Sequence, residues 1–473
     1  MLLMFPLIPI LGGIVCLFLK GAWLRLVLVG CTLLHLVLTL CGLLYPFTSP
    51  CGCFVLDSPS RLFLLALSVL FLLVSLYSRD YMSLNSRKAK PESRFSCCLL
   101  WGLGFMSMTV LSGHLGVTWA AMVCAVLTGW PLVSYHRTPE ARAAARKYLI
   151  MCLSGLGLVL AGNLLLTFSF GEPGSSMLLE NLLKIKTAAE VKWLKAAYLC
   201  ILVGYGTVMG LAPMHTWLPD VCAEAPSPVA ALSPALMNCA YLGILRTGVL
   251  LGTAGLADYR QGVLLFFGLS SMLFGAISII GQKDYSRMLA YSSICGAGWM
   301  ALGAGGGPIG MLGALLYMFC HSMIKGMLFM LCGNIIAVYR SRLVAKVGGL
   351  LQVAPSTGVL WLAGFIALSG LPPFGIFQSN IRICRGLVES GFYLELGGGL
   401  ILAAAIFVGL LLIFVPMAFD MPPEGMSLKP GKPLLKKLLG PAALGGVLAL
   451  IPGVYVPQWL EQFLRDAAAL FGG

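Results

Sequence analysis

Apolar runs of about 20 residues follow one another along almost the whole of this chain. A run of that length is what an α-helix needs to cross the hydrocarbon core of a bilayer. The bilayer interior offers no water to the backbone, so a crossing segment has to satisfy its own N–H and C=O groups as a helix. Strands of a transmembrane barrel would be about half as long and would alternate in polarity. The sequence therefore predicts an all-α polytopic membrane protein.

The composition and the length of the runs agree with this class. Apolar residues make up 59% of the 473 residues and charged residues 10%, whereas a soluble domain carries about 25% charged residues. The first run, 1–19, has no basic segment before it, and we expect no cleavable signal. We predict about fourteen spans, the twelfth of them long enough to contain a break, at 2–19, 23–45, 60–79, 95–112, 115–135, 147–170, 194–213, 229–252, 261–281, 288–304, 309–337, 355–390, 397–418 and 436–456.

Positive charge is gathered in alternate loops, and the net charge is +14. The cations of these loops are Arg79, Arg87, Lys88, Lys90, Arg94, Arg137, Arg142, Arg146, Lys147, Lys283, Arg287, Arg340, Arg342, Lys346, Lys429, Lys432, Lys436 and Lys437. The loop after the seventh span is an exception, since it carries only Asp220 and Glu224. Because Lys and Arg mark cytoplasmic loops, we expect a multi-pass protein of the inner (cytoplasmic) membrane with both termini on the periplasmic face. The expected partner is thus a lipid bilayer and no nucleic acid.

The sixteen cysteines are scattered, mostly inside the predicted spans. Neither the pair Cys51 and Cys53 nor the adjacent Cys97 and Cys98 has the spacing of a zinc or iron–sulfur site. We interpret the cysteines as small apolar packing residues, with a disulfide between Cys51 and Cys53 as the alternative. No glycine-rich phosphate loop or dinucleotide fingerprint follows a strand. The sequence therefore predicts no metal and no cofactor.

Two proline-containing stretches interrupt the apolar pattern, at 210–220 (GLAPMHTWLPD) and at 370–375 (GLPPFG). Proline removes a backbone donor and clashes with the preceding helical turn, so each stretch should break a helix. Paired interruptions at corresponding positions are a sequence sign of repeated halves with broken helices near the membrane midplane. The chain is therefore expected to contain two related halves.

Several motifs together resemble one family of membrane proteins. They are 75–78 (SLYS), 81–82 (YM), 203–207 (VGYGT), 215–220 (HTWLPD), 224–229 (EAPSPV), 284–293 (DYSRMLAYSS), 321–325 (HSMIK) and 371–375 (LPPFG). The chain is similar to the antiporter-like membrane subunits of respiratory complex I, Mrp-type sodium/proton antiporters and membrane-bound hydrogenases. It most resembles the formate-hydrogenlyase-type branch, because Asn238 stands where complex I subunits usually have a lysine.

The resemblance implies two inverted five-helix repeats with broken helices. On this basis we divide the chain into a three-helix N-terminal segment, a first repeat broken near 210–220, a second repeat broken near 370–376, and a C-terminal helix with a tail. The four segments are 1–94, 95–252, 253–418 and 419–473.

The chain departs from the family where the family carries ionisable residues. The neutral residues at these relay positions are Val123 (usually Glu), Val208 (usually Lys), Asn238 (usually Lys), Ser286 (usually Lys) and Asn380 (usually Glu). A histidine that usually follows Ser293 is replaced by Gly296 or its neighbour. A carboxylate beside a lysine changes that lysine's proton affinity, which allows a buried pair to pass charge. Valine cannot bind a proton, so we predict a disabled first half-channel.

The ionisable residues that remain are sparse. The candidates for an ion pathway are Lys325, His321, His215, Arg246, Asp220 and Glu224. Lys325 and His321 are four residues apart and share a helix face, and a charge at mid-bilayer depth costs about 2.5–3.5 kcal/mol. One interpretation is that the two residues form a proton relay, since histidine titrates near neutral pH. The other is that Lys325 bonds helix carbonyls or a neighbouring subunit and holds the break in place. Arg246, Arg382 and Arg385 are expected to snorkel or to pair at subunit contacts, and Asp220 and Glu224 to be structural loop acids.

Three functions remain open from the sequence. The first is a scaffold, spacer or attenuated translocator in a complex-I-like or hydrogenase-type redox complex. Its partners would be an antiporter-like paralogue, a quinone-site-type membrane subunit and a hydrogenase or dehydrogenase arm. The second is active translocation of protons or sodium through Lys325, His321, His215 and water. The third, a redox enzyme that itself binds quinone or metal, is disfavoured because the chain has no cluster or haem motif. In the first two the chain is a non-catalytic subunit of an oxidoreductase complex.

Overall fold

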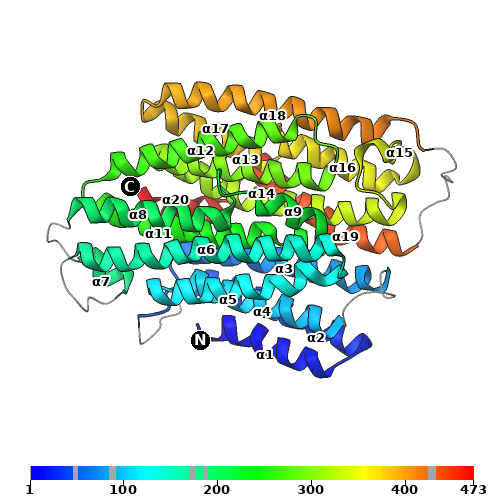
Figure 1. The fold of residues 1–473 in the computed structure, drawn as a ribbon, viewed down its shortest axis with the longest axis horizontal. Coiled ribbons are helices and arrows are strands. Elements are labelled where there is room, and N and C mark those ends of the chain that lie inside the picture. Colours follow the sequence, from blue (N-terminus) through cyan, green and yellow to red (C-terminus); the bar gives the residue numbers. More distant parts are fainter. Residues whose placement is uncertain are drawn as a thin grey trace.

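The computed structural model describes residues 2–45, 52–84, 92–170, 177–184, 190–423 and 433–472. Within these ranges the chain forms twenty α-helices, two short 3-10 helices and no strand. Figure 1 shows the long helices side by side in one bundle, with both chain ends in the same half of it. The predicted all-α membrane fold is confirmed. Predictions for Cys51, Arg87, Lys88, Lys90, Lys429, Lys432 and the side chain of Lys436 concern groups outside the described ranges.

The long helices agree closely with the predicted spans. They are α1 (Met4–Phe18), α2 (Gly21–Leu44), α3 (Ser58–Leu84), α4 (Glu92–Leu111), α5 (Leu115–Val133), α6 (Pro139–Ser169), α8 (Val191–Met209), α11 (Ser233–Thr253), α12 (Ala257–Ile279), α13 (Tyr285–Gly305), α14 (Gly307–Tyr339), α18 (Tyr393–Phe419) and α19 (Pro433–Val454). Eleven stretches within the described ranges are long and apolar enough to cross a membrane. Three predicted spans remain, and they are occupied by the shorter α1, by α13 and by the broken helix within 355–390. The total of fourteen spans stays a prediction.

Both predicted breaks are present. After α8, Gly210 adopts a left-handed conformation (φ +82°), and after α16 Gly370 does the same (φ +71°). Glycine takes this conformation without steric cost, which lets each helix end there. In the first break the indole N–H of Trp217 donates to the carbonyl oxygen of Thr207 at 2.7 Å. The helices that flank the breaks are α9 (Trp217–Glu224), α10 (Ser227–Ala230), α16 (Pro355–Leu368) and α17 (Gly375–Glu389).

The second break is also contacted by the last long helix. A Cβ atom added to Gly453 of α19 would lie 1.9 Å from the carbonyl oxygen of Pro373. A Cβ on Gly375 would lie 2.4 Å from the thiol sulfur of Cys320. Glycine at both positions allows α14, α17 and α19 to meet at the break, while Leu371, Pro372 and Pro373 stay exposed at its outer side.

Short elements were not anticipated from the sequence. They are η1 (Ser134–His136), α7 (Leu179–Lys184), η2 (Val344–Lys346), α15 (Leu350–Val353) and α20 (Gln458–Gly472). The segment expected as a C-terminal tail thus contains α20, which packs against α3, α11 and α14. Its buried residues recur every three or four positions, as on one face of a helix, and they are Leu460, Leu464, Ala467, Ala468 and Phe471.

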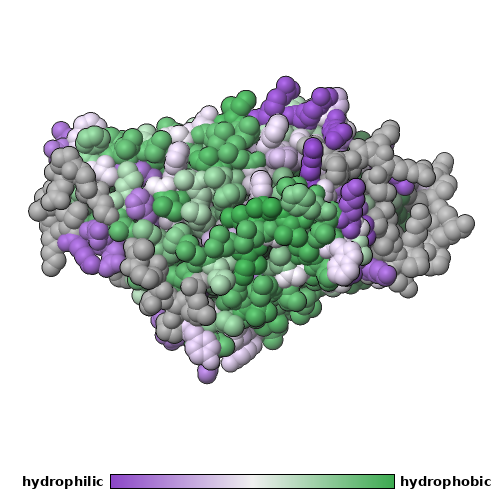
Figure 2. Space-filling model, turned by 90° about the horizontal axis from the view of Figure 1, so that it is seen from below, coloured by the Kyte–Doolittle hydropathy of each residue, from purple (hydrophilic) through white to green (hydrophobic). Residues whose placement is uncertain are grey.

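The start of α6 also differs from the prediction of 147–170. The helix begins at Pro139, because the side-chain oxygen of Thr138 accepts the backbone N–H of Ala141 at 3.1 Å. Threonine at this position and proline in the first turn both favour a helix start. The polar first turns of α6 therefore extend beyond the apolar run. Figure 2 shows an apolar belt over most of one face of the molecule, with polar side chains gathered toward its edges.

Candidate functional site

Lys325 lies in the middle of α14 and is fully buried. Its ammonium group donates to the carbonyl oxygen of Leu289 at 2.6 Å and to the hydroxyl of Ser292, both on α13. Among the described residues, no Asp or Glu forms an ion pair with it. The ammonium therefore ties α14 to α13 through neutral oxygens.

His321 lies one turn before Lys325 and is also fully buried. Its ring stacks on Tyr317, with centroids 5.6 Å apart. Neither ring nitrogen has a hydrogen-bond partner within the described part of the chain. A Cβ atom added to Gly296 would lie 2.6 Å from its Nε2. The ring of His321 thus needs glycine at Gly296.

A small polar cavity adjoins Ser292, the partner of Lys325. Its volume is about 30 Å³, and its walls include Ser292, Ser369 and Asn380. The hydroxyl of Ser369 and the amide oxygen of Asn380 have no hydrogen-bond partner among the described residues. A buried water needs about 10–15 Å³ and two to four polar partners. The second half therefore offers a place where water can connect the Lys325 cluster with Asn380 at the second break.

The first half has a different interior. Val208 is fully buried in the hydrophobic core, and the partly buried Val123 packs against the same core. A cavity of about 60 Å³ between α3, α4, α5, α6, α9 and α11 is bounded almost entirely by apolar side chains, with Thr128, Ser233 and Tyr148 as the polar exceptions. This lining offers few groups that could hold a proton or order a chain of water.

Two further positions at which the resemblance implies a lysine hold uncharged hydrogen-bonding residues. The amide Nδ2 of Asn238 donates to the hydroxyl of Ser322 at 2.8 Å, which joins α11 to α14. Ser286 is buried in the first turn of α13, where its backbone N–H donates to the carboxylate of Asp284 at 2.8 Å. Burial raises the pKa of the Asp284 carboxyl above its usual value. Asn238 thus joins two helices, whereas Ser286 lies in a helix start that Asp284 caps.

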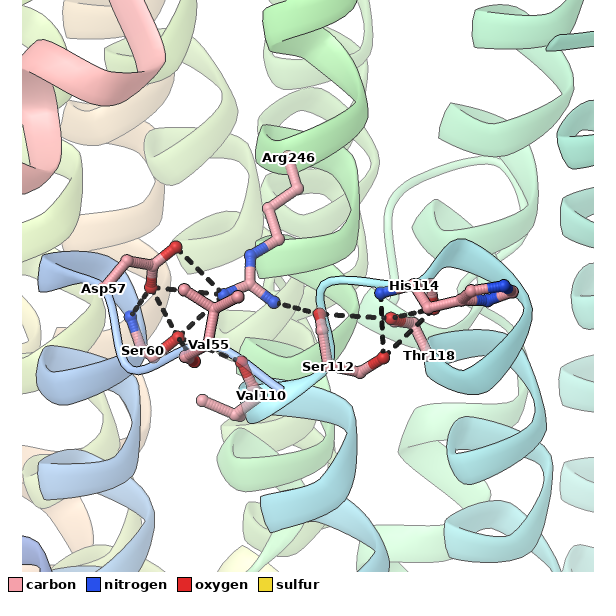
Figure 3. A network of polar contacts seen from close by, with 8 residues as sticks. All are labelled: Val55, Asp57, Ser60, Val110, Ser112, His114, Thr118 and Arg246. Atoms are coloured by element: carbon pink, nitrogen blue, oxygen red, sulfur yellow. Dashed lines mark hydrogen bonds and ion pairs between the residues drawn. The ribbon is translucent and has the colours of Figure 1, made fainter. Parts of the chain in front are cut away.

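Arg246 is paired within the chain, which corrects the expectation of snorkelling or of a subunit contact. Its guanidinium lies 3.2 Å from the carboxylate of Asp57, and it donates to the hydroxyl of Ser60 and the carbonyl of Ser112, each at 2.7 Å. Figure 3 shows these groups converging where the loop before α3 meets the loop after α4. Asp57 also accepts the backbone N–H of Ser60 at 2.8 Å.

Sequence reasoning overlooked Asp57. It precedes a Ser-Pro-Ser stretch typical of a helix start, and it is the first acidic residue of the chain. This isolation could have marked it as a partner for a buried cation. Arg382 and Arg385 also pair within the chain, with Glu461 of α20 and with Glu389 of α17.

Asp220 and Glu224 lie in α9, not in a loop as expected. Asp220 lies 2.8 Å from the ammonium of Lys147 and 3.1 Å from the guanidinium of Arg287. Glu224 lies 2.9 Å from the guanidinium of Arg342. These pairs fasten α9 to α6, to α13 and to the segment after α14.

His215 stands in the first break, with its ring centroid 6.0 Å from that of Phe274. No contact joins His215 to Lys325 or His321 within the described ranges. The structure therefore brings Lys325 and His321 together and leaves the other candidates dispersed.

Comparison with known proteins identifies the family to which this geometry belongs. The family profile described as NADH:quinone oxidoreductase/Mrp antiporter, TM, matches residues 102–406. The chain belongs to this antiporter family. It is 30% identical over 440 residues to a hydrogenase-4 component F homolog of Methylacidiphilum infernorum, a match that covers 90% of both proteins. It is also 30% identical to a Na(+)/H(+) antiporter protein of Alkalihalophilus pseudofirmus, over 86% of this chain and 54% of that protein.

Solved structures show the same fold. The structure of an archaeal membrane-bound sulfane sulfur reductase contains a chain that superposes with a TM-score of 0.88 at 21% identity, with 99% of this chain and 96% of that chain covered. A chain of respiratory complex I from Thermus thermophilus superposes with a TM-score of 0.83 at 24% identity over 100% of both chains. The fold of the antiporter family is thus present from end to end, and the predicted family resemblance is confirmed.

Proposed function

We propose that this antiporter-like membrane subunit serves mainly as a scaffold or spacer in a redox complex. Its partners would be an antiporter-like paralogue, a quinone-site-type membrane subunit and a hydrogenase or dehydrogenase arm. The observation that carries the proposal is the burial of Val208 in an apolar core, at the position where related relays use lysine. A charge transferred through that point would be desolvated without a counter-ion or a polar wall. The first half is therefore closed to ions.

A second candidate function is translocation through the second half alone. Lys325, Ser292 and the 30 Å³ cavity that reaches Asn380 form the one group of buried polar side chains that favours it within the described ranges. Lys325 would bind and release the proton, and water in the cavity would carry it past Ser292. Translocation by this route would not pass through Val123 or Val208.

Replacing Ser292 by alanine separates the two candidates, because it removes the hydroxyl that joins Lys325 to the cavity. The scaffold function predicts an unchanged proton-to-electron ratio in the reconstituted complex, whereas translocation through the second half predicts a clear decrease. Ser293→Ala is the matched control, since Ser293 is equally buried, bonds the Leu289 carbonyl at 3.2 Å and does not line the cavity. A decrease in Ser292→Ala that Ser293→Ala does not share would overturn the scaffold function.

We also infer that the chain is inserted in the cytoplasmic membrane with both termini outside, which puts the loops 80–94, 137–147 and 340–346 in the cytoplasm. Cysteines introduced at the exposed Lys283 and Lys346 should resist a membrane-impermeant maleimide in intact cells and react after the cells are opened. A cysteine at the exposed Ser390, after α17, should react in intact cells. The chain without added cysteines gives the background labelling. Labelling in the opposite pattern would show that the orientation is the reverse of the one inferred.

A further inference from the structure

Three arginines converge on one pocket near the start of α6. The pocket has a volume of about 530 Å³ and is lined by Trp130, Ser134, Arg137, Pro139, Arg142 and Arg146. Arg142 and Arg146 are four residues apart and therefore share one face of α6. Arg137 lies in the turn before the helix, in a left-handed conformation (φ +56°) that is uncommon for a residue other than glycine.

These arginines differ from most others in the protein because they have no acidic partner. Within the described ranges no ion pair or side-chain hydrogen bond involves Arg137, Arg142 or Arg146. Glu140 is in the first turn of α6 but does not line the pocket. The arginines that do form ion pairs are Arg25, Arg79, Arg246, Arg287, Arg342, Arg382, Arg385 and Arg465. Three guanidinium groups without an acidic partner are thus gathered at one pocket.

An apolar groove continues from this pocket along α1, α4 and α5. Its volume is about 380 Å³, and it shares Trp130 with the arginine pocket. Arg94 is the single charged residue among its lining side chains, and like the three arginines it forms no ion pair with a described residue. The other lining residues are Leu17, Phe95, Cys97, Cys98, Trp101, Trp130, Pro131, Leu132 and Tyr135.

The chemistry of the two pockets is that of a ligand with an anionic head and an apolar tail. Guanidinium groups bind phosphate oxygens in pairs of parallel hydrogen bonds, and the N-terminus of α6 adds a partial positive charge. Tryptophan and tyrosine prefer the interface between headgroups and acyl chains. Basic pockets between transmembrane helices on the cytoplasmic side accept anionic lipid headgroups. A free phosphate would use the arginines but would leave the apolar groove without a role.

We propose that this surface is a binding site for an anionic phospholipid. Its phosphate lies among Arg137, Arg142 and Arg146, and an acyl chain follows the groove past Trp130 toward Leu17. The site does not depend on whether the subunit moves ions, since neither pocket includes a candidate relay residue.

The test uses the full chain, purified with the subunits that accompany it, in nanodiscs that contain equal amounts of phosphatidylglycerol and phosphatidylcholine. Lipid that remains after detergent extraction is identified by mass spectrometry. We expect retained phosphatidylglycerol in the original protein and a decrease of about fivefold for each arginine removed in R142Q and R146Q. The matched control is R385Q, because Arg385 is equally exposed and lies outside both pockets.

A second variant and a competitor separate a lipid from free phosphate. L17W fills the groove and leaves every arginine in place, so a bound phospholipid should be lost while its headgroup site remains. Inorganic phosphate at millimolar concentration should not displace the retained lipid. Equal retention by the original protein, R142Q and R146Q would overturn the proposal. Retention that L17W leaves unchanged, or that inorganic phosphate abolishes, would also overturn it, because the arginines alone would then account for the binding and the groove would hold no acyl chain.

Discussion

Replacing Lys325 by alanine should impair assembly of the complex more than it reduces the proton yield per electron. Lys325 is fully buried, and removal of its four-carbon stem leaves a cavity of the kind that costs about 2–5 kcal/mol when Leu or Met becomes Ala. The hydroxyl of Ser292 also loses its ammonium donor, which adds about 1–3 kcal/mol if no other donor takes its place. The Leu289 carbonyl keeps the hydroxyls of Ser292 and Ser293 as donors. The measurements are the amount of intact complex in membranes and the proton-to-electron ratio after reconstitution.

Lys325→Met is the control that separates packing from charge. Methionine keeps most of the stem volume and deletes the ammonium. This variant avoids the cavity and loses only the ammonium's hydrogen bonds, so it should assemble clearly better than Lys325→Ala. A scaffold predicts an unchanged proton-to-electron ratio for it. An intact Lys325→Met complex with a clearly reduced ratio would show that the ammonium carries protons, and translocation through the second half would replace the scaffold function.

Installing the relay residues that related subunits carry should lower the abundance of the protein. In Val123→Glu/Val208→Lys the new ammonium would stand at a position that is fully buried among apolar side chains. A charge at mid-bilayer depth costs about 2.5–3.5 kcal/mol, even when the chain can adapt. Abundance in membranes and the unfolding temperature of the purified complex measure the effect.

Val208→Met is the matched apolar control for this pair of substitutions. It adds volume at the same site without charge, and it shows how much of any loss comes from overpacking, which typically costs about 1–3 kcal/mol. We expect the charged pair to be clearly less abundant than this control. If the charged pair and Val208→Met were equally abundant and unfolded at the same temperature, the first half would be hydrated. The proposal that the first half is closed to ions would then be wrong.

The chain has the fold of the antiporter family, including both helix breaks. The breaks after α8 and α16 are held by contacts that require no ionisable group, namely Trp217 with the Thr207 carbonyl and Gly453 against the Pro373 carbonyl. Asn238 likewise joins α11 to α14 through a hydrogen bond between uncharged groups. These contacts hold the bends of the fold without a buried charge, so the proposed scaffold could retain them.

The sequence alone determined the class, the positions of most long helices and both breaks, because these depend on local chemistry. An apolar run crosses a bilayer only as a helix, and a glycine followed by prolines stops one. The predicted span 60–79 falls within α3, and the break predicted at 370–375 lies between α16 and α17. The family followed in the same way from short motifs that are continuous in the chain.

Only the tertiary structure decided which buried charges are partners. Arg246 and Asp57 are 189 residues apart in the chain, and Arg382 and Glu461 are 79 apart, so no local pattern relates them. The helix α20 was overlooked because its polar residues interrupt any apolar run, although its buried face packs on three other helices. The polar cavity beside Ser292 likewise arises from α13, α14, α16, α17 and α18 together. Such features depend on the free energy of packing distant segments against one another, which the order of residues in each segment does not reveal.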